Sequence, residues 1–188
     1  LEKVPSGMLP ALEIDNILIT ESDQILLRLE QIFGPLGSYL ESSRSLKLRN
    51  LERKLFRSWC IWLCNHTLIE FQNEKRKVNF KEVATLLERE LEQTKSSYLD
   101  ASNLSEEEVI PGSVDIVFIP YLERMNASLA YYKGFSLRDE YPYIDSWFKA
   151  LEKDQVYRGT QGDFHTHSHD LPPQMGGCWI YNDNNQKK

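Results

Sequence analysis

Hydrophobic positions follow one period at the start of the chain and another after it. Up to residue 19 they form two short runs, "LPALEI" and "ILIT", which meet at Asp15 and Asn16. Such runs are typical of short β-strands, and Asp and Asn tolerate the left-handed conformations of a tight hairpin turn. The pattern therefore predicts a β-hairpin.

After this hairpin the period becomes helical. In "TESDQILLRLEQIFGPLG" apolar residues recur every three or four positions. Thr20 and Asp23 form a pair that resembles a capping box, and Gly34 followed by Pro35 should end the helix. The first 34 residues are therefore predicted to be β-β-α.

From the low forties to about residue 153 the pattern predicts helices and no further convincing strand. One helix should reach about Phe71, and a second should run from about Phe80 to Tyr98. A surface loop, "SNLSEEEVIPG", follows. Gly112 then opens "SVDIVFIPYLERMNASLAYY", which is apolar nearly all round, so we expect this helix at the centre of a bundle.

The last part of the chain changes composition. Pro142 fits the first turn of a further helix, because its missing N–H is harmless there. Beyond that helix stands "YRGTQGDFHTHSHDLPPQMGGCW", and the polar end "NDNNQKK" should fray. The predicted organisation is a β-β-α segment over residues 1–36, an all-α domain over 42–157 and a His-, Pro- and Gly-rich tail over 158–188.

Composition indicates a globular protein in a reducing compartment. The chain has 188 residues, of which 41% are hydrophobic and 27% charged, and it has three cysteines, too few for a disulfide-stapled secreted domain. Cys60 and Cys64 lie four apart in "WCIWLC". On a helix they share a face but are too far apart for a disulfide, so core packing is favoured over a redox or metal pair.

Charge and hydropathy exclude two classes of partner. A net charge of −6 with one short basic run, "EKRK" at 74–77, argues against nucleic acid. No stretch approaches the roughly 20 apolar residues of a membrane span, so we expect a soluble protein. The sequence opens without an initiator Met or a signal segment, so either a presequence was removed or the chain starts inside a longer one.

Candidate binding chemistry lies at the start of the first helix. The opening amides of a helix are unpaired donors, so Ser22 and its neighbours can hold a carboxylate, while Glu21 or Asp23 could hold an ammonium group. The Leu9–Pro10 bond is a candidate for the cis form, which would leave the Leu9 backbone free to pair with a peptide. Together these groups suit an α-amino acid head group.

This stretch, "SGMLPALEIDNILITESDQIL", closely resembles the second half of the thioredoxin-like domain of cytosolic glutathione transferases. In that family the pattern "PSGxxPxLxxD...I-x-E-S" supplies the cis-proline and the Glu/Gln-Ser pair that bind glutathione. The resemblance assigns these roles to Leu9, Pro10, Glu21 and Ser22. It implies an α+β fold in which a partial thioredoxin-like β-β-α segment precedes the all-α helical bundle of the family.

The resemblance continues along most of the chain. "SVDIVFIPYLERM" is similar to the core helix of the family, whose N-capping motif ends in the aspartate matched by Asp115. Gly112 replaces the usual capping Ser or Thr, which should weaken the cap by only a few tenths of a kcal/mol, on the order of 0.3. "YPYIDSWFKALEKDQVYR" extends the likeness, and "GDFHTHSHDLPPQMGGC" resembles the C-terminal extension of transferase-like proteins from plants, algae and cyanobacteria.

The family's catalytic residue has no counterpart here. Its Tyr, Ser or Cys lies ahead of the proline hairpin, in a β-α-β-α portion of roughly 50 residues, and this chain begins after that point. No catalytic residue and no cofactor are therefore assigned, and glutathione is the possible ligand.

Two functions follow. We favour a non-catalytic binding or structural subunit of a larger assembly, because an unpaired strand edge and an apolar sheet face need cover from a protein partner or a missing N-terminal segment. The alternative is the C-terminal part of an active glutathione transferase or glutathione-dependent thiol reductase. The tail suggests a photosynthetic organism, so the plastid stroma is favoured and the cytoplasm is the alternative.

Other motifs carry less weight. His165, His167 and His169 alternate, so on an extended chain they would face one way and could bind zinc or copper; we favour a hydrogen-bonded polar tail without metal. No G-x-S-x-G elbow or phosphate-binding glycine loop occurs. Aromatic residues are expected in the core rather than in a substrate cleft: Trp59, Trp62, Tyr131, Tyr132, Trp147 and Phe148.

Overall fold

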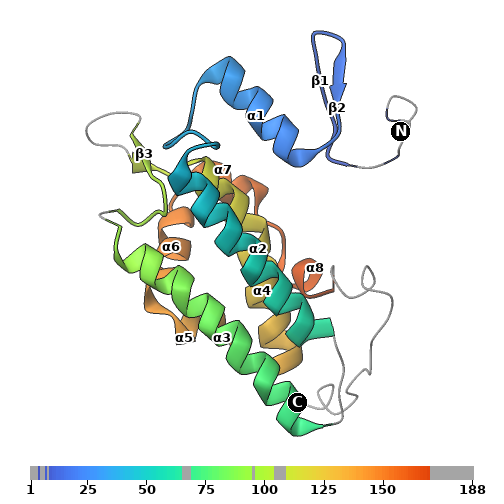
Figure 1. Cartoon of the computed structure of the whole chain (residues 1–188), viewed down its shortest axis with the longest axis vertical. Coiled ribbons are helices and arrows are strands. Elements are labelled where there is room, and N and C mark those ends of the chain that lie inside the picture. Colours follow the sequence, from blue (N-terminus) through green and yellow to red (C-terminus); the bar gives the residue numbers. More distant parts are fainter. Residues whose placement is uncertain are drawn as a thin grey trace.

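A small hairpin–helix part lies at one end of a bundle of long helices (Figure 1). The computed structural model describes residues 4, 7, 9–64, 69–94, 96–103 and 109–169. Its elements, in chain order, are β1 (Leu12–Ile14), β2 (Ile17–Ile19), α1 (Ser22–Phe33), α2 (Ser43–Cys64), α3 (Glu70–Glu92), β3 (Ser102–Asn103), β4 (Val109–Ile110), α4 (Ser113–Lys133), α5 (Leu137–Glu140), α6 (Pro142–Leu151), α7 (Gln155–Thr160) and α8 (Phe164–His169).

The predicted hairpin and first helix are confirmed. β1 and β2 pair antiparallel, and Asp15 and Asn16 have positive φ angles of 51° and 62°. Gly34 ends α1 at φ 84°. The predicted Thr20–Asp23 capping pair is wrong: Glu21 is the N-cap and no side chain caps the helix, because the Asp23 carboxylate is bound by α2 instead.

The predicted boundaries of the next two helices are also wrong. α2 ends at Cys64 rather than near Phe71, and α3 begins at Glu70 and ends at Glu92. The first turns of α3 expose Phe71 and Val78, which are 78% and 52% accessible, so their apolar character does not mark a buried stripe. Periodicity located the buried face and missed the exposed start of the helix.

Strands after residue 42 were not predicted, yet β3 and β4 form a second two-stranded antiparallel sheet. Strands of two residues are too short to show an alternating pattern. The short helices α5, α7 and α8 were not predicted either. α7 is capped by the Asp154 carboxylate, which accepts from the N–H groups of Val156 and Tyr157.

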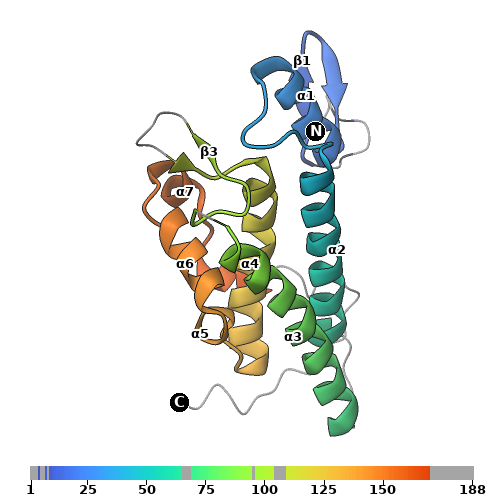
Figure 2. The same ribbon diagram turned by 60° about the vertical axis from the view of Figure 1, so that its left-hand side comes forward.

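The bundle core lies among α2, α3, α4 and α6. α2 packs against α3 and α4, and α3 packs against α6; in Figure 2, α2 and α4 run side by side. Four of the six aromatics expected in the core are at most 3% exposed, whereas Tyr131 is 42% exposed. α4 packs against α2, α5 and α8. Ile116 is 40% exposed, so this helix is not buried all round. Its large buried residues form one stripe: Val114, Phe118, Leu122, Met125 and Leu129.

The linker between α1 and α2 is tied to the bundle by Asp100. One Asp100 carboxylate oxygen accepts from the Ser38 N–H at 2.7 Å and the other from the Ser38 hydroxyl at 2.8 Å. The Ser113 N–H donates to the Leu36 carbonyl at 2.8 Å. These bonds fix where the hairpin–helix part meets the start of α4.

The cysteine pair supports a prediction about thiol reactivity. Neither Cys60 nor Cys64 forms a disulfide, and each is 8% exposed. Burial, with a smaller contribution from Cys64, raises the pKa of the Cys60 thiol to about 11. In a Cys178→Ser variant, which removes the third thiol, Cys60 and Cys64 can be measured by themselves. We expect both thiols of the folded protein to react with an aromatic disulfide reagent at pH 7.5 at least about 100-fold more slowly than those of the protein unfolded in guanidinium, since the thiolate is the reactive form. Equal rates in the two conditions would contradict the buried, inert pair.

Candidate functional site

The four residues expected to bind glutathione lie at one end of the hairpin. Leu12 pairs with Ile19 at the open end of β1 and β2, so the chain before Leu12 and the chain after Ile19 leave the sheet together. Leu9 and Pro10 therefore lie at the same end as Glu21 and Ser22. All four side chains are exposed, and the Leu9–Pro10 bond is cis, as the sequence suggested.

The start of α1 presents backbone donors. Ser22 is the first helical residue, and the first intrahelical bond runs from the Ile25 N–H to the Glu21 carbonyl at 2.9 Å. The amides that precede Ile25 have no partner in an ideal helix and receive no side-chain cap here. Unpaired amides at a helix start, together with the helix dipole, favour a carboxylate, and the Ser22 hydroxyl lies beside them.

Of the two acids next to these amides, Asp23 is already engaged. Its carboxylate oxygens accept from Arg49 at 2.5 Å and from Arg53 at 3.2 Å. Because Asp23 is 52% exposed, these pairs contribute less than about 1 kcal/mol to stability. Glu21 is exposed and makes no cap bond, so it is the acid that remains for an ammonium group.

Sequence reasoning missed the arginines and the acid behind them. Arg49 and Arg53 are four apart on α2, a spacing that places both on one helix face. Arg53 also lies 3.5 Å from Glu52, whose side chain is 1% exposed and makes no hydrogen bond. Burial raises the pKa of Glu52, opposed by the two arginines. The i, i+4 spacing was visible in the sequence, but the partner on α1 was not.

Two clefts flank α1. One, of about 400 Å³, lies along β2 and α1 and is lined by Leu18, Thr20, Glu21, Gln24 and Arg28 among others. The other, of about 290 Å³, lies between α1 and α2 and has leucines on its wall and Asp23, Arg49 and Arg53 at its edge. Glu21 therefore stands at a hollow large enough for part of a small peptide.

The histidine tract is not extended. His165 and His167 lie in α8, where residues two apart are separated by about 200° around the axis and face opposite ways. The side chain of His169 and residues 170–188 lie outside the described residues. In the described part, no group of three or more His, Cys, Asp or Glu side chains is arranged to hold a metal. His165 and His167 therefore do not face one way, as they would on the extended chain that the metal alternative required.

No protein-family model and no curated protein matches the chain. Many solved structures resemble it, among them the three that follow. A dehydroascorbate reductase of Chlamydomonas reinhardtii is 15% identical with a TM-score of 0.66, over 87% of this chain and 71% of that one. Rice GST1 (OsGSTU1) in complex with glutathione is 16% identical with a TM-score of 0.65, over 88% and 75%. A class Gtt2 glutathione S-transferase of Vibrio parahaemolyticus is 18% identical with a TM-score of 0.53, over 89% and 76%.

These likenesses establish the fold. The chain shares the fold of these dehydroascorbate reductase and glutathione transferase structures, with a partial thioredoxin-like start and the C-terminal helical domain. The α+β fold class expected from the sequence is confirmed, and the resemblance seen in the sequence holds at the level of the fold. At these sequence identities the likeness shows the fold and does not show the activity. Within the described residues no helix is both long and apolar enough to span a membrane.

Proposed function

We propose that this chain binds the γ-glutamyl end of glutathione at the start of α1 and works as a non-catalytic subunit of a larger assembly. The observation that carries the proposal is the exposed Glu21–Ser22 pair at an uncapped helix start, beside a cleft of about 400 Å³. The Ser22 amide and hydroxyl would hold the carboxylate and Glu21 the ammonium group. The Leu9 backbone would pair with the peptide.

The role as a subunit is supported by the apolar surface of the hairpin–helix part. No residue of α1 is buried, and Phe33 and Ile17 are 79% and 58% exposed. A surface of this kind requires cover, either from a protein partner or from an N-terminal segment that completes the thioredoxin-like domain. The second candidate is therefore the C-terminal part of an active glutathione transferase or thiol reductase, which the dehydroascorbate reductase and transferase structures favour.

The same proposal includes a plastid location. It is supported by the tail sequence "GDFHTHSHDLPPQMGGC", which resembles the C-terminal extension of transferase-like proteins from plants, algae and cyanobacteria. Fractionation of cells that make the protein should recover it with the stroma, and recovery with the cytosol would overturn this part.

Calorimetric titration tests the binding site. We expect glutathione and γ-glutamylcysteine to bind, and cysteinylglycine, which lacks the γ-glutamyl group, to bind at least about tenfold more weakly, a difference of roughly 1.4 kcal/mol. Ser22→Ala and Glu21→Gln should each weaken glutathione binding by about tenfold. Glu70→Gln is the matched control, because Glu70 is also an exposed acid at the uncapped start of a helix, α3. Glu70 is not part of the proposed site, so this change should leave glutathione binding unchanged.

One result tests the γ-glutamyl site, and another decides between the two candidates. Equal binding of glutathione and cysteinylglycine, or no binding of either, would overturn the γ-glutamyl site. Turnover of a model electrophile, of dehydroascorbate or of a mixed disulfide by the longest natural form of the protein would favour the enzyme over the non-catalytic subunit.

A further inference from the structure

A second polar cluster lies away from α1, where α8 docks on α4. It surrounds a cavity of about 100 Å³ lined by Glu123 and Asn126 of α4, by Gln161, and by His167 of α8. The side chains of Glu123 and His167 are 9% and 13% exposed. The cluster therefore encloses titratable groups that the proposed glutathione site does not use.

Three polar atoms of this cluster are shielded from solvent and have no hydrogen bond. They are the Oδ1 of Asn126 and both ring nitrogens of His167. Leaving a buried polar atom unpaired costs about 1–3 kcal/mol. The Nε2 of His167 lies 3.4 Å from the Oε2 of Glu123, longer than the usual N–H···O range of about 2.7–3.2 Å. Several unpaired groups beside one cavity indicate that something fills it.

We propose that His167 and Glu123 form a binding site for a divalent transition-metal ion such as Zn²⁺. Zinc binds imidazole nitrogen and carboxylate oxygen at about 2.0–2.1 Å, so two ligands at a tetrahedral angle lie about 3.3–3.4 Å apart. The separation of Nε2 and Oε2 matches this spacing. The unpaired Asn126 Oδ1, which lines the same cavity, and water complete the coordination.

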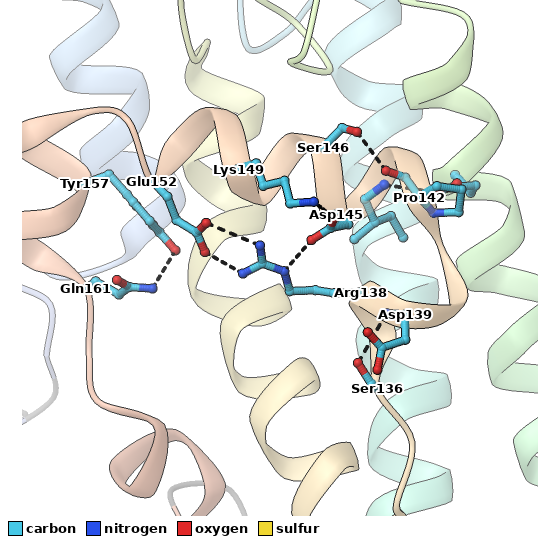
Figure 3. Close-up of polar contacts among 12 residues, drawn as sticks. Ser136, Arg138, Asp139, Pro142, Asp145, Ser146, Lys149, Glu152, Tyr157 and Gln161 are labelled. Atoms are coloured by element: carbon cyan, nitrogen blue, oxygen red, sulfur yellow. Dashed lines mark hydrogen bonds and ion pairs between the residues drawn. The ribbon is translucent and has the colours of Figure 1, made fainter.

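Neighbouring groups hold the two ligands in place. The Tyr157 hydroxyl donates to the other Glu123 oxygen, Oε1, at 2.7 Å. Gln161 in turn donates to the Tyr157 oxygen at 3.1 Å, as Figure 3 shows. Gly162 lies against the imidazole: a Cβ there would be 2.6 Å from Nε2. Such outer partners orient metal ligands in proteins.

The nearest cation is already neutralised. Arg138 also lines the cavity, but its guanidinium donates to Asp145 at 2.7 Å and to both oxygens of Glu152, as Figure 3 shows. The charge of Arg138 is thereby compensated, so its guanidinium does not compete with the ion for the Glu123 carboxylate. With one carboxylate, one imidazole and one amide as ligands, we expect affinity in the micromolar range, on the order of 1–100 μM, weaker than a structural zinc site.

Zinc titration of the metal-free full chain tests this site. We expect one ion to bind with a rise in melting temperature, and Co²⁺ to give visible absorption bands when it takes zinc's place. His167→Gln and Glu123→Gln should each weaken Zn²⁺ binding by at least about tenfold and remove the cobalt bands. His165→Gln, an exposed change in the same helix, is the control and should alter neither.

The proposal would be overturned if no zinc bound below about 1 mM, which is well above the expected range. It would also be overturned if zinc still bound with both His167→Gln and Glu123→Gln in place. An equal loss of zinc affinity in His165→Gln would place the ion on the exposed histidine tract and would overturn it too. Circular dichroism checks that each variant folds. Should His167→Gln unfold, Glu123→Gln, which keeps the side-chain shape, decides the result. None of these outcomes depends on glutathione binding.

Discussion

Replacing Gly112 by serine, the residue type that usually caps a helix, should destabilise the protein by at least about 3 kcal/mol. The sequence predicts the opposite, a stronger cap by a few tenths of a kcal/mol, about 0.3. The structure explains the reversal, because a Cβ at residue 112 would lie 1.8 Å from the Asp100 carbonyl oxygen and 3.1 Å from the Leu36 carbonyl oxygen.

Neither neighbour can move cheaply. Both contacts are with backbone atoms, and the Asp100 N–H is held by the Asp115 carboxylate at 3.0 Å. The Asp100 side chain binds Ser38, so a shift at Asp100 also disturbs the linker between α1 and α2. Room for a serine would therefore require a rearrangement where the two parts of the chain meet.

Urea unfolding followed by circular dichroism measures the effect. Gly159→Ser is the matched control: nothing lies within 4 Å of a Cβ there, and serine is the better helix former, so stability should stay equal or rise by about 0.5 kcal/mol. If Gly112→Ser unfolds at the same urea concentration as the parent, the close approach to Asp100 is not a constraint on this position.

Local chemistry made the hairpin predictable, and long-range contacts made Gly112 unpredictable. Asp15 and Asn16 specify their turn through their own backbone preferences, so the local sequence suffices. The space around Gly112 is set by Asp100, twelve positions away, and nothing in a sequence reports a carbonyl oxygen at that distance. The start of α3 was missed for a related reason. Phe71 is exposed because no other described part of the chain covers it, and the local sequence does not show this.

The candidate sites show the same division. Glu21 and Ser22 were found because the binding groups lie side by side at a helix start. The engagement of Asp23 by Arg49 joins residues 26 positions apart, and the pairing of Glu123 with His167 joins residues that are further apart still. Tertiary packing decides which of these residues meet, and the pattern of a single sequence does not contain that information.

Asp115→Asn should cost about 3–5 kcal/mol and lower the melting temperature by roughly 6–20 °C. The side chain is fully buried and accepts four hydrogen bonds. Its Oδ1 accepts from the Leu99 N–H at 2.8 Å and from the Trp147 indole N–H at 2.7 Å. Its Oδ2 accepts from the N–H groups of Asp100 and Gly112 at 3.0 and 3.3 Å.

Asparagine keeps the shape and loses one acceptor. Its amide nitrogen must face two of the four donors, whichever way the group is turned, so two buried N–H groups lose their partner. Asp139→Asn, at an exposed position of α5, makes the same chemical change and should stay within about 0.5 kcal/mol of the parent.

A double-mutant cycle with Trp147→Phe separates the indole bond from the three backbone bonds. If Asp115 holds α6 to the start of α4 through Trp147, the asparagine change should cost about 1 kcal/mol less in the Trp147→Phe background, because one of the stranded donors is already gone. An unchanged cost in that background would mean that the three backbone donors alone account for the effect. Asp115 would then fix the approach of residues 99–112 to α4 without fixing α6.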